Sequence, residues 1–101
     1  MALRITIQQD ANTARIKLEG RIAGPWATEL RSAWEKWAPS LGQRKLSLDL
    51  RNTTYADALG IRVLREIYSQ TEAELGTGTP WTQYLADEIT RKSANTNEEE
   101  Q

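Results

Sequence analysis

Apolar and polar residues alternate strictly in three segments of the first half of the chain. The apolar positions are Leu3, Ile5 and Ile7, then Ala14, Ile16 and Leu18, and then Leu46, Leu48 and Leu50. A period of two residues predicts β-strands with one buried face. The polar residues 9–13 between the first two segments include Asp and Asn, which favour a turn, so these two strands are predicted to form an antiparallel hairpin. Because the alternation is clean, we expect helices on one face of the sheet and water on the other.

Residues 24–38 have the spacing of an amphipathic helix. Pro25 suits the first helical position, and Pro39 disfavours continuation past residue 38. Apolar residues recur every three or four positions along one stripe, formed by Trp26, Leu30, Ala33, Trp34 and Trp37. A stripe with this spacing is typical of a core-facing surface, and the chain has no Phe to fill that volume. We therefore predict that these tryptophans pack against the sheet rather than bind a ligand.

Two further helices and a short strand are predicted in the second half. Asp57 is a natural N-cap for a helix that runs toward Thr71, and Thr79 followed by Pro80 marks the start of a third helix. Residues 73–75 are predicted to form a short fourth strand before the glycine-containing connection. The predicted order is β-β-α-β-α-β-α, an α/β fold with a mixed four-stranded sheet and helices mainly on one face.

Length and composition predict one domain over residues 1–92. The chain has 101 residues, and residues 93–101 are almost wholly polar with a run of three glutamates, so we expect a disordered acidic tail there. The net charge is −1, from 13 basic and 14 acidic residues, with no basic stripe, so a nucleic-acid partner is not expected. The N-terminus enters the first strand directly and no long apolar run follows, so we expect a cytoplasmic protein without direct membrane insertion.

Candidate catalytic chemistry is sparse. The chain contains no Cys and no His, which excludes a thiolate nucleophile, an imidazole base and the usual zinc sites. Asp49 and Asp57 are best explained as a surface residue on the polar phase of a strand and as a helix cap. Residues 76–79 contain two glycines but lack the lysine of a phosphate-binding loop, and a strand-to-helix connection explains them. We therefore expect no enzyme activity, no cofactor and no metal.

Residues 46–64 resemble the signature of the STAS domain, which occurs in bacterial anti-sigma-factor antagonists and in anion transporters. The shared features are a strand that ends in an acidic–apolar pair, a short loop, and a helix opened in the family by Asp-Ser-Ser-Gly. The exit from the second strand at residues 18–20 and the segment 73–75 also follow the family order, so the resemblance covers about residues 3–92. It implies a STAS fold and protein–protein interaction in signal transduction and transcription regulation.

The central motif departs from the family at the phosphorylated position. Asp57 and Gly60 match, but Ala58 and Leu59 replace the two serines. In typical antagonists the kinase activity of the anti-sigma factor phosphorylates the second serine and releases the partner. Leu59 is thus a degenerate phosphoacceptor position without an oxygen. Hydroxyls occur nearby in the predicted loop, at Thr53, Thr54 and Tyr55, but their spacing does not mark them as acceptors.

The resemblance places a partner-binding surface on this loop and on the start of the helix. The expected contact residues are Thr53, Thr54, Tyr55, Asp57, Ala58, Leu59, Gly60 and Arg62, with the adjacent residues 20–22 as a further contribution. The loss of both serines has two interpretations: a structural module that has lost regulation, or a surface that stays competent to bind.

Three functions are considered for the chain. The first is an anti-sigma-factor-antagonist-like regulator that binds an anti-sigma factor or serine-kinase-like protein. The second is an accessory STAS subunit of a membrane-transport ATPase or another signalling complex. The third, ranked last, is enzymatic or small-molecule binding, suggested by the Trp-rich helix and the family's occasional nucleotide binding. The sequence does not set the oligomeric state.

Overall fold

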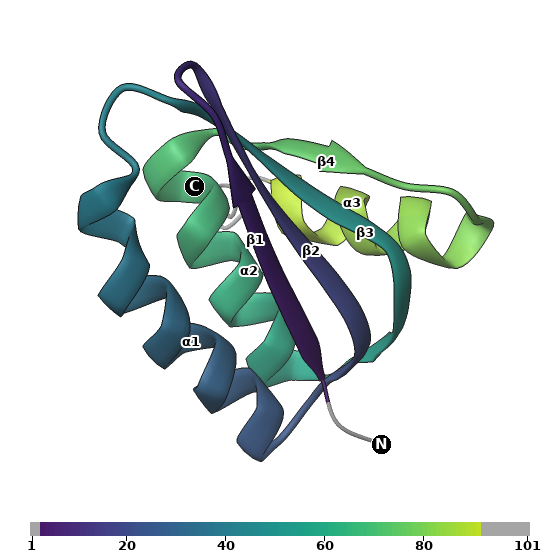
Figure 1. Cartoon of the computed structure of the whole chain (residues 1–101). Helices are drawn as coiled ribbons and strands as arrows, with labels where there is room; N and C mark the ends of the chain where they lie inside the picture. The colour runs from purple at the N-terminus through teal and green to yellow at the C-terminus, as the bar shows by residue number, and fades with distance from the viewer. Residues whose placement is uncertain (1–2, 92–101) are drawn as a thin grey trace, which may run out of the picture.

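The chain folds as an α/β structure with one mixed sheet and three α-helices (Figure 1), as a computed structural model shows for residues 3–91. The elements are β1 (Arg4–Gln9), β2 (Thr13–Ile22), α1 (Pro25–Trp37), the short 3₁₀ helix η1 (Ala38–Ser40), β3 (Lys45–Ala56), α2 (Ala58–Thr71), β4 (Glu74–Gly76) and α3 (Pro80–Thr90). The predicted order β-β-α-β-α-β-α is confirmed. The predicted tail, residues 93–101, lies outside the described residues.

The sheet has the strand order β1-β2-β3-β4 and mixes both kinds of pairing. β1 and β2 form the predicted antiparallel hairpin, whose turn is held by Asp10: its Oδ1 accepts the N–H groups of Asn12 and Thr13, both at 2.9 Å. β2 pairs with β3, and β3 with β4, in parallel. Parallel neighbours need a crossover, and α1 and α2 supply these two connections.

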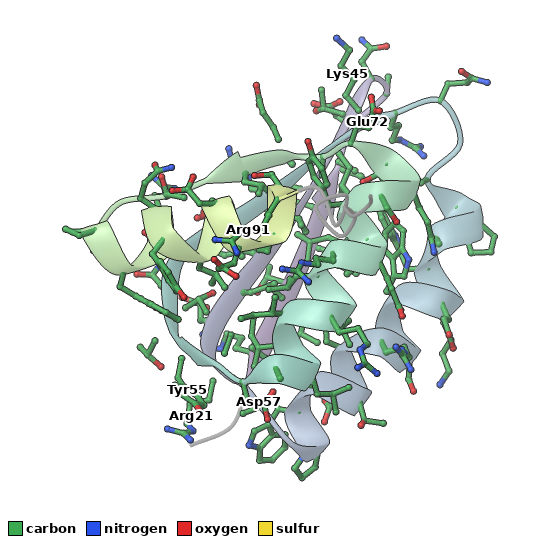
Figure 2. All side chains as sticks on the ribbon, turned by 180° about the vertical axis from the view of Figure 1, so that it is seen from behind. Arg21, Lys45, Tyr55, Asp57, Glu72 and Arg91 are labelled. Carbon is green, nitrogen blue, oxygen red and sulfur yellow. The ribbon has the colours of Figure 1, made fainter. Side chains whose placement is uncertain are left out.

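All three helices cover the same face of the sheet, as predicted (Figures 1 and 2). The strand residues that point to the helices are buried: Ala14, Ile16, Leu18, Ile22, Leu46, Leu48 and Leu50. The opposite face carries the polar phase of the strands and is open to water. Among residues 3–91, no helix is long and apolar enough to cross a membrane.

The tryptophans of α1 belong to the core, as the sequence predicts. Trp34 is buried, and its Nε1–H donates to Oε1 of Gln70 on α2 at 3.1 Å. Trp26 and Trp37 are half-buried and pack against the same core. An Arg31–Glu66 ion pair of 2.7 Å also joins α1 to α2, so both packing and polar contacts fix the two helices against each other.

Strands β2 and β3 are longer than the alternation predicts. The pattern ends near residues 19 and 50, whereas the pairing continues through Gly20 opposite Thr53 to Ile22 opposite Ala56. Register shifts in this segment break the side-chain alternation while the backbone continues to pair. The loop predicted to hold Thr53, Thr54 and Tyr55 is therefore strand, as are residues 20–22, and the candidate site is built on paired strands.

The start of α2 packs directly against the end of β2. Gly60, in the first turn of α2, is buried, and a Cβ built there would collide with the backbone carbonyl oxygen of Ile22. The backbone of α2 can approach β2 this closely only because the residue is glycine. The same Ile22 carbonyl accepts the N–H of Asp57 at 3.2 Å.

This contact predicts that Gly60→Ala is strongly destabilising. In an ordinary helix position the change would stabilise by about 1 kcal/mol, but here β2 and α2 must separate. We expect the free energy of unfolding to fall by about 3 kcal/mol and Tm to fall by more than about 10 °C, measured by thermal and urea unfolding. Gly42→Ala is the matched control, since Gly42 has a positive φ of 59° with open space around it and should cost only about 1 kcal/mol. An equal or smaller loss in Gly60→Ala would contradict the close contact.

Candidate functional site

The strand extension places Thr53 in the interior rather than on the predicted contact surface. Thr53 is only 2% exposed, and its Oγ1–H donates to the Leu18 carbonyl at 3.1 Å. Its own carbonyl accepts the indole N–H of Trp81 on α3 at 3.0 Å. Thr53 therefore joins β3 to β2 and α3, and its hydroxyl is accessible neither to a partner nor to a kinase.

Tyr55 is the prominent exposed side chain at this end of β3. It is 43% exposed, and the Arg21 guanidinium on the neighbouring strand lies 4.7 Å from the centroid of its ring. Arg21 and Tyr55 are paired residues of β2 and β3, so the sheet holds the cation over the ring. Thr54 is exposed beside them. Figure 2 shows Arg21 and Tyr55 side by side near Asp57, at the end of the molecule opposite Lys45 and Glu72.

Asp57 caps α2, as predicted, and also reaches a second helix start. Its Oδ1 accepts the N–H of Gly60 at 2.8 Å, and its Oδ2 accepts the N–H of Gly24 at 3.0 Å, 33 residues away. Gly24 directly precedes α1. The hydrogen bonds from Gly60 and then Gly24 hold the pKa of the Asp57 carboxyl below its usual range. This carboxylate is thus a structural bridge whose two oxygens are both bonded to main-chain groups.

Some of the contact residues predicted at the start of α2 are exposed to solvent, and others are buried. Ala58 and Arg62 are exposed. Leu59 is half-buried and packs against the hydrophobic core, so the replacement of serine by leucine adds an inward contact. Gly60 is buried against Ile22 and cannot touch a partner. The predicted set therefore divides into surface residues and residues that support the surface.

We call the exposed set the α2-start surface: Arg21, Thr54, Tyr55, Ala58 and Arg62. Three strands or helices contribute to it, namely β2, β3 and α2. It carries two guanidinium groups, while the adjacent Asp57 carboxylate is held by the backbone of two helix starts. The surface is aromatic and cationic.

Asp49 is buried, in contrast to the surface position predicted for it. It lies on the open face of the sheet but is 4% exposed, because Arg51 folds back over it. The Arg51 Nε donates to Oδ1 and a terminal nitrogen donates to Oδ2, both at 3.0 Å. This two-point hydrogen bond from Arg51 holds the pKa of Asp49 below its usual range. About 25 Å of extended strand separates residues 49 and 57, so the two carboxylates do not form a pair.

Sequence reasoning missed two residues that shape the site. Gly24 supplies the second N–H for Asp57, and Trp81 donates to the backbone of Thr53. Neither contact has a local signal, because each joins segments far apart in the sequence. The glycine-containing connection does behave as predicted, since the Thr79 hydroxyl caps α3 by accepting the Thr82 N–H at 3.1 Å. Within residues 3–91, no group of three or more acidic, His or Cys side chains is arranged to hold a metal ion.

Comparison with known proteins shows the fold but no family. No family model matches the chain, and no curated protein matches it in sequence. Among solved structures, a chain described as "Crystal Structure Analysis of Mglu" superposes with a TM-score of 0.58 at 18% identity. The match covers 74% of this chain and 19% of that one, so the present chain spans about a fifth of that protein's length. At this identity the similarity shows the α/β arrangement alone.

The Asp57 bridge predicts a pH-dependent loss of stability in Asp57→Ala. At pH 7 the variant loses two hydrogen bonds to the charged carboxylate, and we expect its free energy of unfolding to fall by about 2 kcal/mol. Because the folded-state pKa of Asp57 is lowered, its contribution is fully present above the unfolded pKa of about 3.9 and is lost as pH falls through the folded pKa. The difference in the free energy of unfolding between wild type and Asp57→Ala, measured by urea unfolding, should therefore become smaller as the pH is lowered toward 3.

A surface carboxylate provides the control for this experiment. Asp87→Ala on α3 removes an exposed carboxylate and should change the free energy of unfolding by less than about 0.5 kcal/mol. If Asp57→Ala lowers the free energy of unfolding by the same amount at pH 7 and at pH 3, the charge of the carboxylate is not the source of the stabilisation.

Proposed function

We propose that this chain is a non-enzymatic STAS-like module that binds a protein partner through the α2-start surface in the bacterial cytoplasm. Its role is that of an anti-sigma-factor-antagonist-like regulator in signal transduction and transcription. The observation that carries the proposal is the exposed Tyr55, held under Arg21 beside a helix start that Asp57 fixes in place.

The composition of this surface suits a binding interface. Tyrosine and arginine are enriched among residues that dominate binding energy, and Tyr55 and Arg21 already contact each other in the free protein. Residues that are positioned before binding lose less conformational entropy on association. A second cation, Arg62, is exposed on α2. The expected partner therefore presents an apolar socket with acidic groups around it.

The surface is expected to bind without a phosphorylation switch at the family's usual position. Leu59 has no oxygen there, and its side chain packs against the core. The neighbouring Thr53 hydroxyl is buried in a bond to Leu18. A phosphate would add about two negative charges beside Asp57, and this chain has removed the acceptor for it. The proposed regulator is therefore competent to bind its partner at all times.

Two exposed tyrosines provide a matched pair of variants for the test. Tyr55 lies on the α2-start surface, and Tyr84, 55% exposed, lies on α3. With the tagged full chain as bait in lysate of its source cells, we expect mass spectrometry to identify an anti-sigma factor or serine-kinase-like protein. The dissociation constant for that purified partner, measured by calorimetry, should rise at least about tenfold in Tyr55→Ala and less than about twofold in Tyr84→Ala.

Two results decide between a regulator and an accessory subunit: which protein is captured, and whether its affinity falls in Tyr55→Ala but not in Tyr84→Ala. A membrane-transport ATPase whose binding depends on Tyr55 would reassign the chain as an accessory subunit that uses the same surface. Equal binding by wild type and Tyr55→Ala, with the variant folded by circular dichroism, would contradict the proposed surface.

A further inference from the structure

Strand β1 forms an open edge of the sheet. Its six residues pair with β2 on one side, and among residues 3–91 no strand pairs with its other side. The opposite edge, β4, is three residues long, which is a common way to protect a sheet edge. Proline and charged residues that point toward the core also protect sheet edges. β1 contains no proline, and none of its side chains on the helix-facing side is charged. Its free backbone groups are therefore available to another strand.

An apolar strip follows this edge on the helix side. Ile5 and Ile7 are paired with the buried Leu18 and Ile16 of β2 and share their face of the sheet. Ile5 is half-buried, while Ile7 remains 37% exposed at the edge. A strand added beside β1 would cover Ile7.

Helix α1 is the helix nearest to this edge and carries half-buried apolar residues of its own. α1 lies on the β1 side of the helix layer (Figure 1), and Arg31 on its inner flank pairs with Glu66 of α2. At about 100° per residue, Trp26, Ala33 and Trp37 lie on the flank opposite Arg31. All three are half-buried. The side of the helix layer nearest β1 is therefore apolar, like the helix-facing residues of β1 itself.

The charges of β1 are complementary to those of a second, antiparallel copy. Arg4 is the first residue of β1, and Asp10 directly follows its last residue. Both are exposed, and they are an even number of positions apart, so they lie on the same face of the strand. Backbone hydrogen bonds from Asn12 and Thr13 lower the pKa of Asp10. When Ile7 lies opposite Ile7 of the second copy, Arg4 lies opposite Asp10 at both ends of the pair. In the neighbouring register, with Thr6 opposite Thr6 of the second copy, Arg4 faces Gln8. In that register no residues of opposite charge face each other.

We propose that the β1 edge is a homodimerisation surface, on which two copies pair antiparallel about Ile7 and continue one sheet of eight strands across the interface. The two-fold symmetry of this arrangement satisfies the backbone edges of both copies at once. It also brings the two exposed Ile7 side chains together between the α1 helices. The proposal concerns a different element from the partner-binding surface and does not depend on it.

Single-cysteine variants test the register directly, because the natural chain has no Cys. In Ile7→Cys the two thiols face each other, within the roughly 4.4–6.8 Å Cα separation that a disulfide needs, and mild oxidation should link most of the protein as dimers. Ile5→Cys is the matched control on the same strand and face. Its two copies lie four residues apart along the pair, about 13 Å, and should stay unlinked. Linkage of Ile5→Cys but not Ile7→Cys would overturn the proposed pairing.

The association of the unmodified chain gives an independent measurement. Sedimentation velocity over a range of concentrations should show a monomer–dimer equilibrium for the wild type. Ile7→Lys places two cations together in the apolar strip and should raise the dimer dissociation constant at least about tenfold. Tyr84→Lys, an equivalent change on α3, should leave it within about twofold. A wild type that remains monomeric throughout, or an Ile7→Lys variant that is folded by circular dichroism and dimerises equally well, would overturn the proposal.

Discussion

The carboxylate of Asp57 holds the starts of two helices at the end of the parallel β2–β3 pair, and the geometry of the candidate site depends on it. One oxygen accepts the N–H of Gly60 in α2, and the other accepts the N–H of Gly24 before α1. Both helix starts offer backbone donors that the helices themselves cannot satisfy. The close approach of Gly60 to Ile22 then fixes the distance between α2 and β2.

These contacts of Asp57 and Gly60 explain how so few exposed residues can form a defined surface. Arg21 and Tyr55 stand on paired positions of β2 and β3, immediately before the point where Asp57 fastens the helices. Thr53 and Leu59, which the family resemblance places on the contact surface, are instead turned toward neighbouring strands and the core. The buried residues hold the exposed ones in position, so a substitution in either set is expected to alter the proposed binding, through lost support in one case and lost contact in the other.

The sequence predicted the elements and their order well because hydrophobic period and capping residues are local signals. Asp57 and Thr79 cap helices where expected, and the alternating segments are strands. The strand ends were misplaced because pairing between β2 and β3 continues through a segment whose bulges disrupt the alternation. Asp49 is buried because Arg51 folds over it. The bond from Gly24 to Asp57 spans 33 residues and leaves no local pattern. Gly60, predicted as a contact residue, is instead buried against Ile22, because a glycine within a helix can also mark close packing.

The most direct test of this account is amide hydrogen exchange at Gly24, measured by NMR in the wild type and in Asp57→Ala. Gly24 has a positive φ of 54° and lies outside any helix or strand, so its N–H has Asp57 as its protecting partner. If Asp57 bridges the two helix starts, the N–H groups of Gly24 and Gly60 exchange slowly in the wild type and faster when the carboxylate is removed. Rapid exchange at Gly24 in the wild type, or protection unchanged in the variant, would contradict the bridge between the two helix starts.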